Sequence, residues 1–214
     1  MGKLAVYRFF VGWIARIIRP VKVIGEKKLG KEQSIFCINH TSNWDAVAFV
    51  EAFKAEPMAM YKAELRENRF LRGFLDGINA IPVHRGEGDL NAIKAALTGL
   101  KNGKSLLIAP EATRNKNYDG SLLPFKVGAV SLSIKTRTPI RPIYIYHPRN
   151  KKGKIKGRTL IFVGEVLDLS QFYGQQQSKE LLSQANELLY EEFCELRECC
   201  QKYLADKKAK KSKR

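Results

Sequence analysis

The stretch "SIFCINHTSNWDAVAFVEAFK", residues 34 to 54, predicts a buried strand that passes through a short polar turn into a helix. Its first part, "SIFCIN" (34–39), is an apolar run of strand length. From Ser42 to Lys54 we expect a helix. Ser42 is suited to be its N-cap, and Asp45 three residues later completes the pattern of a capping box.

The same alternation of short β-rich runs and longer helical runs continues along the chain. Further strands are expected at 57–61, 80–83, 105–110, 139–146 and 159–166, and helices at 63–77, 89–103, 126–136 and 179–204. Strands that alternate with helices indicate a single α/β sandwich, with a mostly parallel or mixed central sheet flanked by helices. A chain of 214 residues is long enough for one domain, which we place at 20–205.

The charge of the chain points to a polyanionic partner. Its 38 Lys and Arg against 21 Asp and Glu give a net charge of +17. Such an excess suits nucleic acid, an anionic membrane surface or phosphorylated small molecules. Part of it lies in "RNKKGKIKGR" (149–158), interpreted as a basic turn between two strands, and part in a tail at 206–214, expected to be disordered. A merely soluble basic protein is the alternative.

The N-terminal segment indicates which of these polyanionic partners is the more suitable. "LAVYRFFVGWIARIIRP" (4–20) is apolar and aromatic, but arginines interrupt it, and its longest uncharged run has seven residues. A spanning helix needs about 20 apolar residues. We therefore expect residues 1–19 to form an amphipathic helix in the membrane interface, inserting Phe9, Phe10, Trp13, Ile14 and Ile17. The alternative is a helix packed on the protein's own core.

The cysteines do not suggest a metal site. The four of them (Cys37, Cys194, Cys199 and Cys200) lack the spacing of zinc ligands. Reduced thiols in a cytosolic setting are the simpler interpretation.

Polar residues follow three of the predicted strands, and these are His40, Arg85 and Glu111. In α/β folds the loops at the carboxyl ends of the strands form the site. Asp45, in the first turn of its helix, can hydrogen-bond His40, fix its tautomer and raise its basicity. His40 would then act as a general base. A cap and a surface histidine that merely share a stretch of sequence are the alternative.

Cations that suit a phosphate group lie in separate loops near these residues. Arg85 and Arg114 carry planar guanidinium groups that match the geometry of a phosphate, and Lys126 follows in "PFKVGA". The sequence therefore provides donors for a phosphate pocket.

Four ordered blocks resemble the glycerophospholipid acyltransferase family, most closely its bacterial-type 1-acyl-sn-glycerol-3-phosphate (lysophosphatidic acid) acyltransferases. The family pattern N-H-x-S-x-x-D is matched by "NHTSNWD" (39–45), and an apolar run ending in Arg is matched by "AIPVHR" (80–85). F-P-E-G-T-R-S appears as "APEATRN" (109–115) and V-P-I-V-P-V as "TPIRPI" (138–143). Each block is modest, but the ordered set is specific.

The resemblance implies an acyl transfer without a metal or further cofactor. The donor would be acyl-CoA or acyl carrier protein, the acceptor the sn-2 hydroxyl of 1-acylglycerol 3-phosphate, and the product phosphatidic acid for phospholipid biosynthesis. It assigns catalysis to His40 and Asp45, and substrate binding to Arg85, Glu111, Thr113, Arg114 and Lys126. It also implies a peripheral or monotopic enzyme on the cytoplasmic face of the membrane, in contact with anionic lipids.

The sequence departs from the family at Ala109, Ala112 and Arg141. Alanine does not easily adopt a positive φ. We therefore expect the loop at Ala112 either not to be left-handed or to have shifted.

Several alternatives remain open. The acceptor could be glycerol 3-phosphate or another lysophospholipid. A Ser-His-Asp hydrolase would use Ser42, Ser131 or Ser133, but the chain has no G-x-S-x-G motif. A nucleic-acid-binding module would explain the net charge but neither the polar residues at three strand ends nor the apolar N-terminal segment, so nucleic acid is not the expected partner. A membrane-anchoring protein without activity would not need His40. His84 and His147 are interpreted as structural or solvated.

Overall fold

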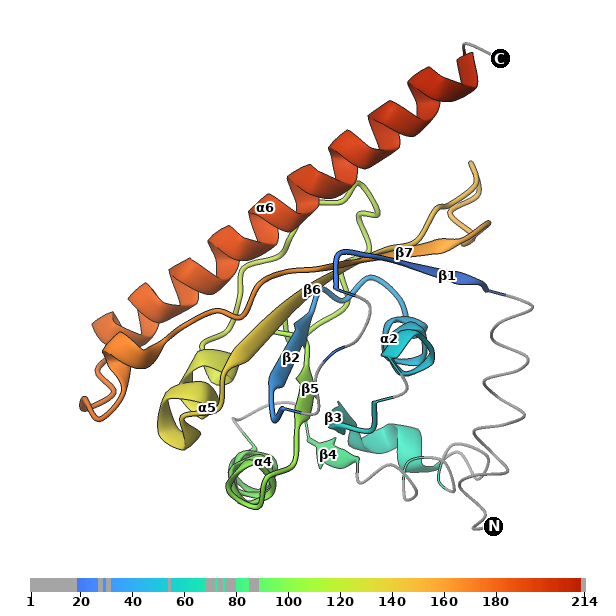
Figure 1. Ribbon diagram of the computed structural model, residues 1–214. Coiled ribbons are helices and arrows are strands. Elements are labelled where there is room, and N and C mark those ends of the chain that lie inside the picture. Colours follow the sequence, from blue (N-terminus) through green and yellow to red (C-terminus); the bar gives the residue numbers. More distant parts are fainter. Residues whose placement is uncertain are drawn as a thin grey trace.

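The computed structural model describes residues 19–26, 29, 32–53, 55–67, 72, 75, 80–84 and 89–212 (Figure 1). The predicted interfacial helix at 1–19 lies outside this part except for Arg19. Arg85 lies outside it as well.

Within the described residues, seven strands form one mixed sheet in the order β1-β7-β6-β2-β5-β3-β4. Their bounds are β1 Val21–Ile24, β2 Ile35–Ile38, β3 Met58–Lys62, β4 Ile81–Val83, β5 Leu106–Ile108, β6 Ile140–Tyr146 and β7 Thr159–Val163. Strands β4, β3, β5, β2 and β6 run parallel to one another. Strand β7 is antiparallel to β6, and β1 runs parallel to β7. The predicted α/β class with a mostly parallel or mixed sheet is confirmed.

Helices cover both faces of the sheet (Figure 1). They are α2 Asp45–Phe53, α4 Leu90–Lys101, α5 Gly128–Thr136 and α6 Lys179–Ser212, with short 3₁₀ helices η1 Ala63–Glu67 and η2 Ser170–Phe172. Successive side chains of a strand point to opposite faces. In β2, Ile35 and Cys37 accordingly join the core cluster beneath α4, α5 and α6, whereas Phe36 and Ile38 join the one beneath α2.

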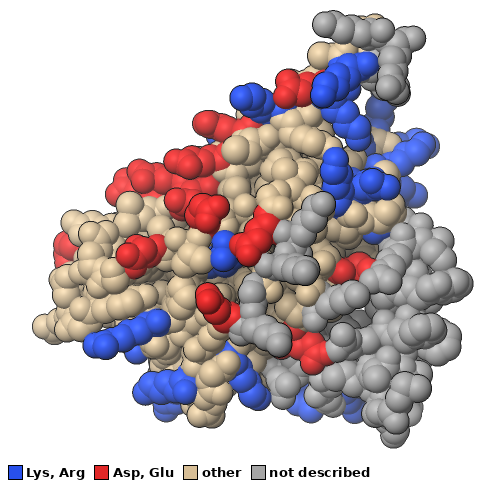
Figure 2. All heavy atoms as spheres, in the orientation of Figure 1, with Lys and Arg blue, Asp and Glu red and all other residues tan. Residues whose placement is uncertain are grey.

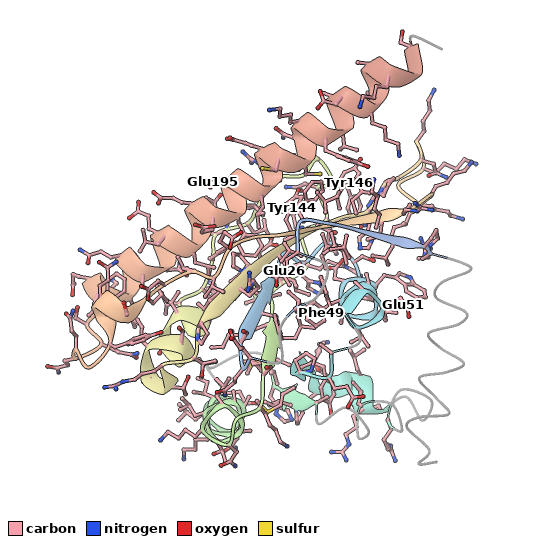
Figure 3. The ribbon with its side chains drawn as sticks, in the orientation of Figure 1. Glu26, Phe49, Glu51, Tyr144, Tyr146 and Glu195 are labelled. Atoms are coloured by element: carbon pink, nitrogen blue, oxygen red, sulfur yellow. The ribbon has the colours of Figure 1, made fainter. Side chains whose placement is uncertain are left out.

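The α2 layer is held by aromatic packing. Phe49 of α2 is fully buried and lies 5.0 Å from Phe36 of β2, measured between ring centroids. Figure 3 shows Phe49 between α2 and the sheet, while Tyr144 and Tyr146 of β6 lie on the side of α6. Both layers thus anchor the central strands from which the site is built.

Two segments differ from the sequence-based expectation. Strand β1 was not predicted; among the described residues it pairs with β7. The prediction of a disordered tail at 206–214 is wrong for residues 206–212, which continue α6 to Ser212. Lysine and alanine are good helix formers, and cations near a helix C-terminus interact favourably with the helix dipole.

The helix predicted at 63–77 is described over 63–67, as η1. Most of its remainder lies outside the described residues. Within the described part of the chain, no helix is both long enough and apolar enough to cross a membrane.

The loops that carry the predicted site residues His40 and Glu111 lie at one end of the sheet. The parallel strands β2, β5 and β6 finish there, and β7 and β1 start there, as their register shows. We call this the site end. His40, Glu111 and His147 follow β2, β5 and β6 at the site end.

Candidate active site

Asn39 fastens the end of β2 to β6. Its buried side chain donates from Nδ2 to the carbonyl of Ile145 at 3.0 Å and accepts the Ile145 amide at Oδ1 at 2.6 Å. This pair extends the ladder between β2 and β6 beyond its last partners, Ile38 and Ile143. The residues that follow, His40 on one strand and His147 on the other, therefore emerge side by side.

The turn before α2 (Asp45–Phe53) forms one half of the predicted capping box, the bond from the Ser42 amide to the Asp45 carboxylate, whereas Ser42 Oγ binds the amide of Trp44 and not that of Asp45. Ser42 Oγ accepts the amide of Trp44 at 3.1 Å, and the amide of Ser42 donates to Asp45 Oδ2 at 2.9 Å. The two bonds satisfy amides that the helix itself leaves unpaired. They also turn the Asp45 carboxylate back towards His40.

His40 and Asp45 form a pair at the site end. Nδ1 of His40 lies 2.9 Å from Asp45 Oδ2. The Asp45 side chain is 1% exposed and the His40 side chain 31%. An ionised carboxylate only accepts, so Nδ1 carries the proton. The lone pair is then on Nε2, on the opposite side of the ring, where an imidazole can act as a base.

Asp45 is held by more donors than the sequence suggested. Oδ2 also accepts the amides of Thr41, at 2.8 Å, and Ser42. Oδ1 lies 2.6 Å from Nε2 of His147. Burial alone would raise the pKa of Asp45, but the hydrogen bonds from His147, His40 and the Ser42 amide lower it below its ordinary value.

His147 is the site residue that the sequence-based interpretation missed. It was assigned a structural or solvated role, whereas its side chain is 1% exposed and touches the proposed catalytic carboxylate. Its Nδ1 lies 2.9 Å from Oγ1 of Thr159, the first residue of β7. A signal was present, because His147 follows the predicted strand 139–146 just as His40 follows its own strand.

Glu111 joins the third block to His40. Its carboxylate accepts the amide of His40 at Oε1, at 2.8 Å, and the amide of Leu123 at Oε2, at 3.0 Å. The residue is 3% exposed. Burial raises the pKa of Glu111, and the two amide hydrogen bonds only partly oppose this. Glu111 thus fixes the backbone position of His40 directly, through a hydrogen bond to its amide.

The loop at Ala112 is left-handed after all. Ala112 has φ of +54°, and its amide donates to the carbonyl of Ala109 at 3.0 Å. The first of the two expected alternatives, that the loop is not left-handed, is therefore wrong. The turn is fixed on both sides, because Glu111 binds the amide of His40 and the amide of Asn115 donates to the His40 carbonyl at 2.7 Å. These bonds hold the backbone in a conformation that alanine disfavours.

The remaining predicted site residues differ in how close the structure places them to His40 and Asp45. Arg114 donates from Nη1 to Asn43 Oδ1 at 3.0 Å, which places its guanidinium beside the loop between His40 and Asp45. Thr113 is exposed next to it. The backbone of Lys126 is tied to the carbonyl of Pro110 at 2.8 Å, while its side chain is exposed. Arg85 is not among the described residues.

The third departure from the family lies away from the site. Arg141 is near the start of β6, at the opposite end from His147. Its Nη1 lies 3.1 Å from Oε2 of Glu26 and 3.1 Å from the carbonyl of Gly164. Arg141 therefore joins β6 to the segments that follow β1 and β7.

Arg149 binds the active-site loop from the hairpin between β6 and β7. Its Nη2 donates to the carbonyl of Thr41 at 3.1 Å, and its guanidinium lies 3.8 Å from the ring centroid of Tyr118. Among the described residues, no group of three or more His, Cys, Asp or Glu side chains is arranged to hold a metal ion.

Comparisons with known proteins agree with this geometry. A family model described as Acyltransferase matches residues 20–146, more than half of the chain. The chain is 32% identical over 138 residues to the 1-acyl-sn-glycerol-3-phosphate acyltransferase of Bacillus subtilis, covering 64% of this chain and 67% of that protein. It is 30% identical over 128 residues to the Saccharomyces cerevisiae enzyme of the same name, covering 58% of this chain and 42% of that protein.

The fold also resembles a solved structure, the 1-acyl-sn-glycerophosphate (LPA) acyltransferase PlsC from Thermotoga maritima. The TM-score is 0.64 at 24% sequence identity, over 92% of this chain and 84% of that one. At this identity the similarity concerns the fold. Together with the family model and the four ordered blocks, it leads to one assignment: the chain belongs to the acyltransferase family.

Proposed function

We propose that this protein transfers a fatty acyl chain from an acyl thioester to the sn-2 hydroxyl of 1-acylglycerol 3-phosphate, giving phosphatidic acid. The observation that carries the proposal is the His40–Asp45 pair at the end of β2, in a chain whose relatives bear the name of this activity.

The pair can perform the proton transfers of such a reaction. Nε2 of His40 takes the proton of the acceptor hydroxyl while the hydroxyl oxygen attacks the thioester carbonyl. Asp45 orients the ring and stabilises the imidazolium that forms. When the tetrahedral intermediate collapses, the carbon–sulfur bond breaks and the imidazolium returns its proton to the departing thiolate, which leaves as a thiol. The chain needs no nucleophile of its own for this sequence.

The acceptor phosphate is proposed to bind beside the third block. Arg114 lies against Asn43, in the loop between the two catalytic residues. We assign Arg85, Thr113 and Lys126 to the same phosphate. Glu111 already receives two backbone amides, so its contribution to acceptor binding would come through the position of the loop rather than a contact with the phosphate.

A second proposal concerns where the enzyme works. Exposed cations gather at the site end from three segments, and we call them the basic surface: Lys22, Lys151, Lys152, Lys154, Lys156, Arg158, Lys202, Lys207, Lys208 and Lys210. Arg19 joins the hairpin to the start of β1 through the carbonyl of Ile155 at 3.2 Å. Lys22 joins β1 to the end of α6 through the hydroxyl of Tyr203 at 2.7 Å.

The charges are separated along the molecule (Figure 2). Six glutamates lie on α6 between residues 180 and 198, and the red atoms of Figure 2 follow this part of the helix. Many of the blue atoms lie around the end of α6 and the hairpin, and others lie along the lower part of the view, in the region of α4 and α5. The hydrogen bond from Lys22, with Lys207 and Arg158 nearby, lowers the pKa of Tyr203, as a positive surface should.

This polarity favours one orientation on an anionic membrane. The basic surface would face the lipid headgroups and the acidic part of α6 would face away. Because Arg149 connects the hairpin to Thr41, His40 lies on the side that would face the membrane. We therefore propose peripheral or monotopic association with the cytoplasmic leaflet, where the lysophospholipid is embedded.

The test is an acyl-transfer assay of the purified full chain. Donors would be an acyl-CoA and the matching acyl carrier protein thioester, and acceptors lysophosphatidic acid, glycerol 3-phosphate and lysophosphatidylcholine, with the position of the new ester determined. Phosphatidic acid acylated at sn-2 is the expected product. Preference for glycerol 3-phosphate would replace the proposed acceptor, and transfer to none of the three would overturn the function. Arg114→Ala should raise the KM for the acceptor more than that for the donor, because an arginine–phosphate contact is removed.

A further inference from the structure

We propose that His147 is a positioning residue for the acyl transfer, which holds the Asp45 carboxylate in the orientation that His40 requires. This inference rests on the proposed function. His147 would touch neither substrate; it acts through Asp45.

The geometry is a continuous line of four side chains, His40, Asp45, His147 and Thr159. The three distances between successive polar atoms are 2.9 Å, 2.6 Å and 2.9 Å. The line begins at the end of β2, passes the first residue of α2 and the end of β6, and finishes at the start of β7. Four elements of the fold are therefore fixed relative to the catalytic carboxylate.

Each member is held in its place. Asp45 and His147 have side chains that are 1% exposed, and Thr159 is 1% exposed as a residue. The amide of Thr159 donates to the carbonyl of Pro20 at 2.9 Å, which anchors the far end of the line. A residue whose side chain is locked by burial and by a second hydrogen bond positions its partner more sharply than one free to rotate.

His147 provides the hydrogen bond to Oδ1 of Asp45, whereas the other donors bind Oδ2. Oδ2 accepts from His40 and from the amides of Thr41 and Ser42, whereas Oδ1 faces His147. Without the His147 N–H, a buried carboxylate oxygen would lose a charge-assisted hydrogen bond. Rotation of the carboxylate, or its protonation, would then satisfy Oδ1 at the expense of the bond to His40.

Charged residues approach this line of four side chains from neighbouring segments. A small cavity beside His147 is lined by Arg19 and Glu51, together with Trp44 and Thr159. Glu111 approaches from the third block through the His40 amide. Arg149 lies at the Thr41 carbonyl.

A second His–Asp pair lies in an exposed part of the described chain. His84 and Asp89 have the same spacing, with Nδ1 and Oδ2 3.1 Å apart. The His84 side chain is 79% exposed, and Asp89 accepts amides as the N-cap of α4. Substitution of His84 therefore serves as a control that changes an exposed histidine outside the line.

The experiment compares His147→Phe, His147→Gln and His84→Phe in steady-state transfer across a range of pH. The Gln variant can still present an N–H to Oδ1, whereas the Phe variant cannot. His147→Phe should lower kcat by about 10–100-fold, the effect of slight misplacement of a catalytic group, while the acceptor KM changes little. Its acidic limb of kcat against pH should move to higher pH, because Asp45 loses a bond that favours its ionised form. His147→Gln should recover most of the rate, and His84→Phe should match the wild type.

Two results would overturn the proposal. One is a wild-type kcat and pH profile in folded His147→Phe. The other is equal loss in the Phe and Gln variants with an unmoved pH profile, which a packing role alone would give. If His147→Phe does not fold, Thr159→Val decides: a loss of rate with the limb moved to higher pH supports the proposal, and wild-type behaviour overturns it.

A readout without substrate separates this inference from the proposed function. The chain has three histidines, so their imidazole NMR signals can be assigned by substitution. The His40 signal should move in His147→Phe more than in His84→Phe. Inactive wild-type protein with such a shift would remove the proposed function and keep the contact, whereas an active enzyme whose His40 signal is unmoved would overturn the positioning role.

Discussion

The carboxylate of Glu111 accepts the backbone amide of His40, with 2.8 Å between Oε1 and the nitrogen. Its second oxygen accepts the amide of Leu123, so one buried side chain joins the end of β2 to the loop after β5. The position of the proposed base thus depends on a residue that donates nothing to the chemistry itself.

Replacing Glu111 by Ala should destabilise the protein by about 1–3 kcal/mol. Two amides would be left without their acceptor, although removal of a desolvated carboxylate offsets part of that loss. Urea unfolding followed by circular dichroism measures the difference. Glu187→Ala, at an exposed position of α6, should change stability by less than about 0.5 kcal/mol. Equal effects of the two substitutions would contradict the structural role of Glu111.

Substituting His40 by Ala should reduce transfer by about 10²–10⁴-fold, the usual contribution of a general base. The fold should survive, because His40 is partly exposed and Asp45 keeps His147 as a partner. His84→Ala should retain full activity, since His84 is largely exposed and its partner Asp89 is the N-cap of α4. Near-normal turnover in a folded His40→Ala protein would remove the proposed mechanism.

The two His-Asp pairs show how far sequence alone can lead. Both have H-x4-D spacing, and both histidines lie within two residues of the end of a strand. The four-block resemblance, and not the spacing, selects His40. Local patterns also predicted one half of the capping box at Ser42 and most strands, because such patterns depend on neighbouring residues.

Local sequence patterns could not predict contacts between distant segments of the chain. The bond between His147 and Asp45 joins residues 102 positions apart, and the pairing of Asn39 with Ile145 helps to bring the ends of β2 and β6 together for it. The order of the strands, on which that pairing depends, is a property of the whole sheet. The conformation of Ala112 was missed for the same reason, since bonds to His40 on both sides of the turn override its local preference.

Asp45 should make stability depend on pH in the acidic range. Its pKa is lowered in the folded protein, so its contribution is present above the ordinary carboxyl pKa and is lost as the pH falls through the folded pKa. Wild type should therefore exceed Asp45→Asn in unfolding free energy near pH 6, and the gap should narrow below about pH 4. Urea titrations at several pH values measure the gap, with Asp206→Asn on exposed α6 as a control. A constant gap down to pH 3 would contradict the shift.

Replacing Ala112 by Gly should stabilise the protein by about 0.5–1 kcal/mol. At φ of +54° the methyl group is strained, and glycine removes that strain at some cost in unfolded-chain entropy. Gly103→Ala tests the opposite sign, because Gly103 has φ of +77° and an added Cβ would meet nothing within 4 Å. That substitution should destabilise by about 1 kcal/mol. Chemical unfolding of both variants checks the pair, and a destabilised Ala112→Gly would show that the turn carries no strain.

The basic surface should direct the enzyme to anionic membranes. Changing the hairpin residues Lys151, Lys152, Lys154 and Lys156 to Gln should weaken binding to vesicles that contain phosphatidylglycerol by roughly 10²-fold or more, at about 1 kcal/mol per charge near the surface. The loss should shrink as salt is added, because exposed charges act through screened attraction. Four exposed lysines elsewhere provide a variant with the same change in net charge: Lys94, Lys101, Lys104 and Lys135. That variant should bind nearly as wild type, since those residues belong to α4, α5 and the loop before β5, away from the hairpin. Equal losses in the two variants would mean that net charge alone drives binding, and the orientation proposed for His40 would then lack support.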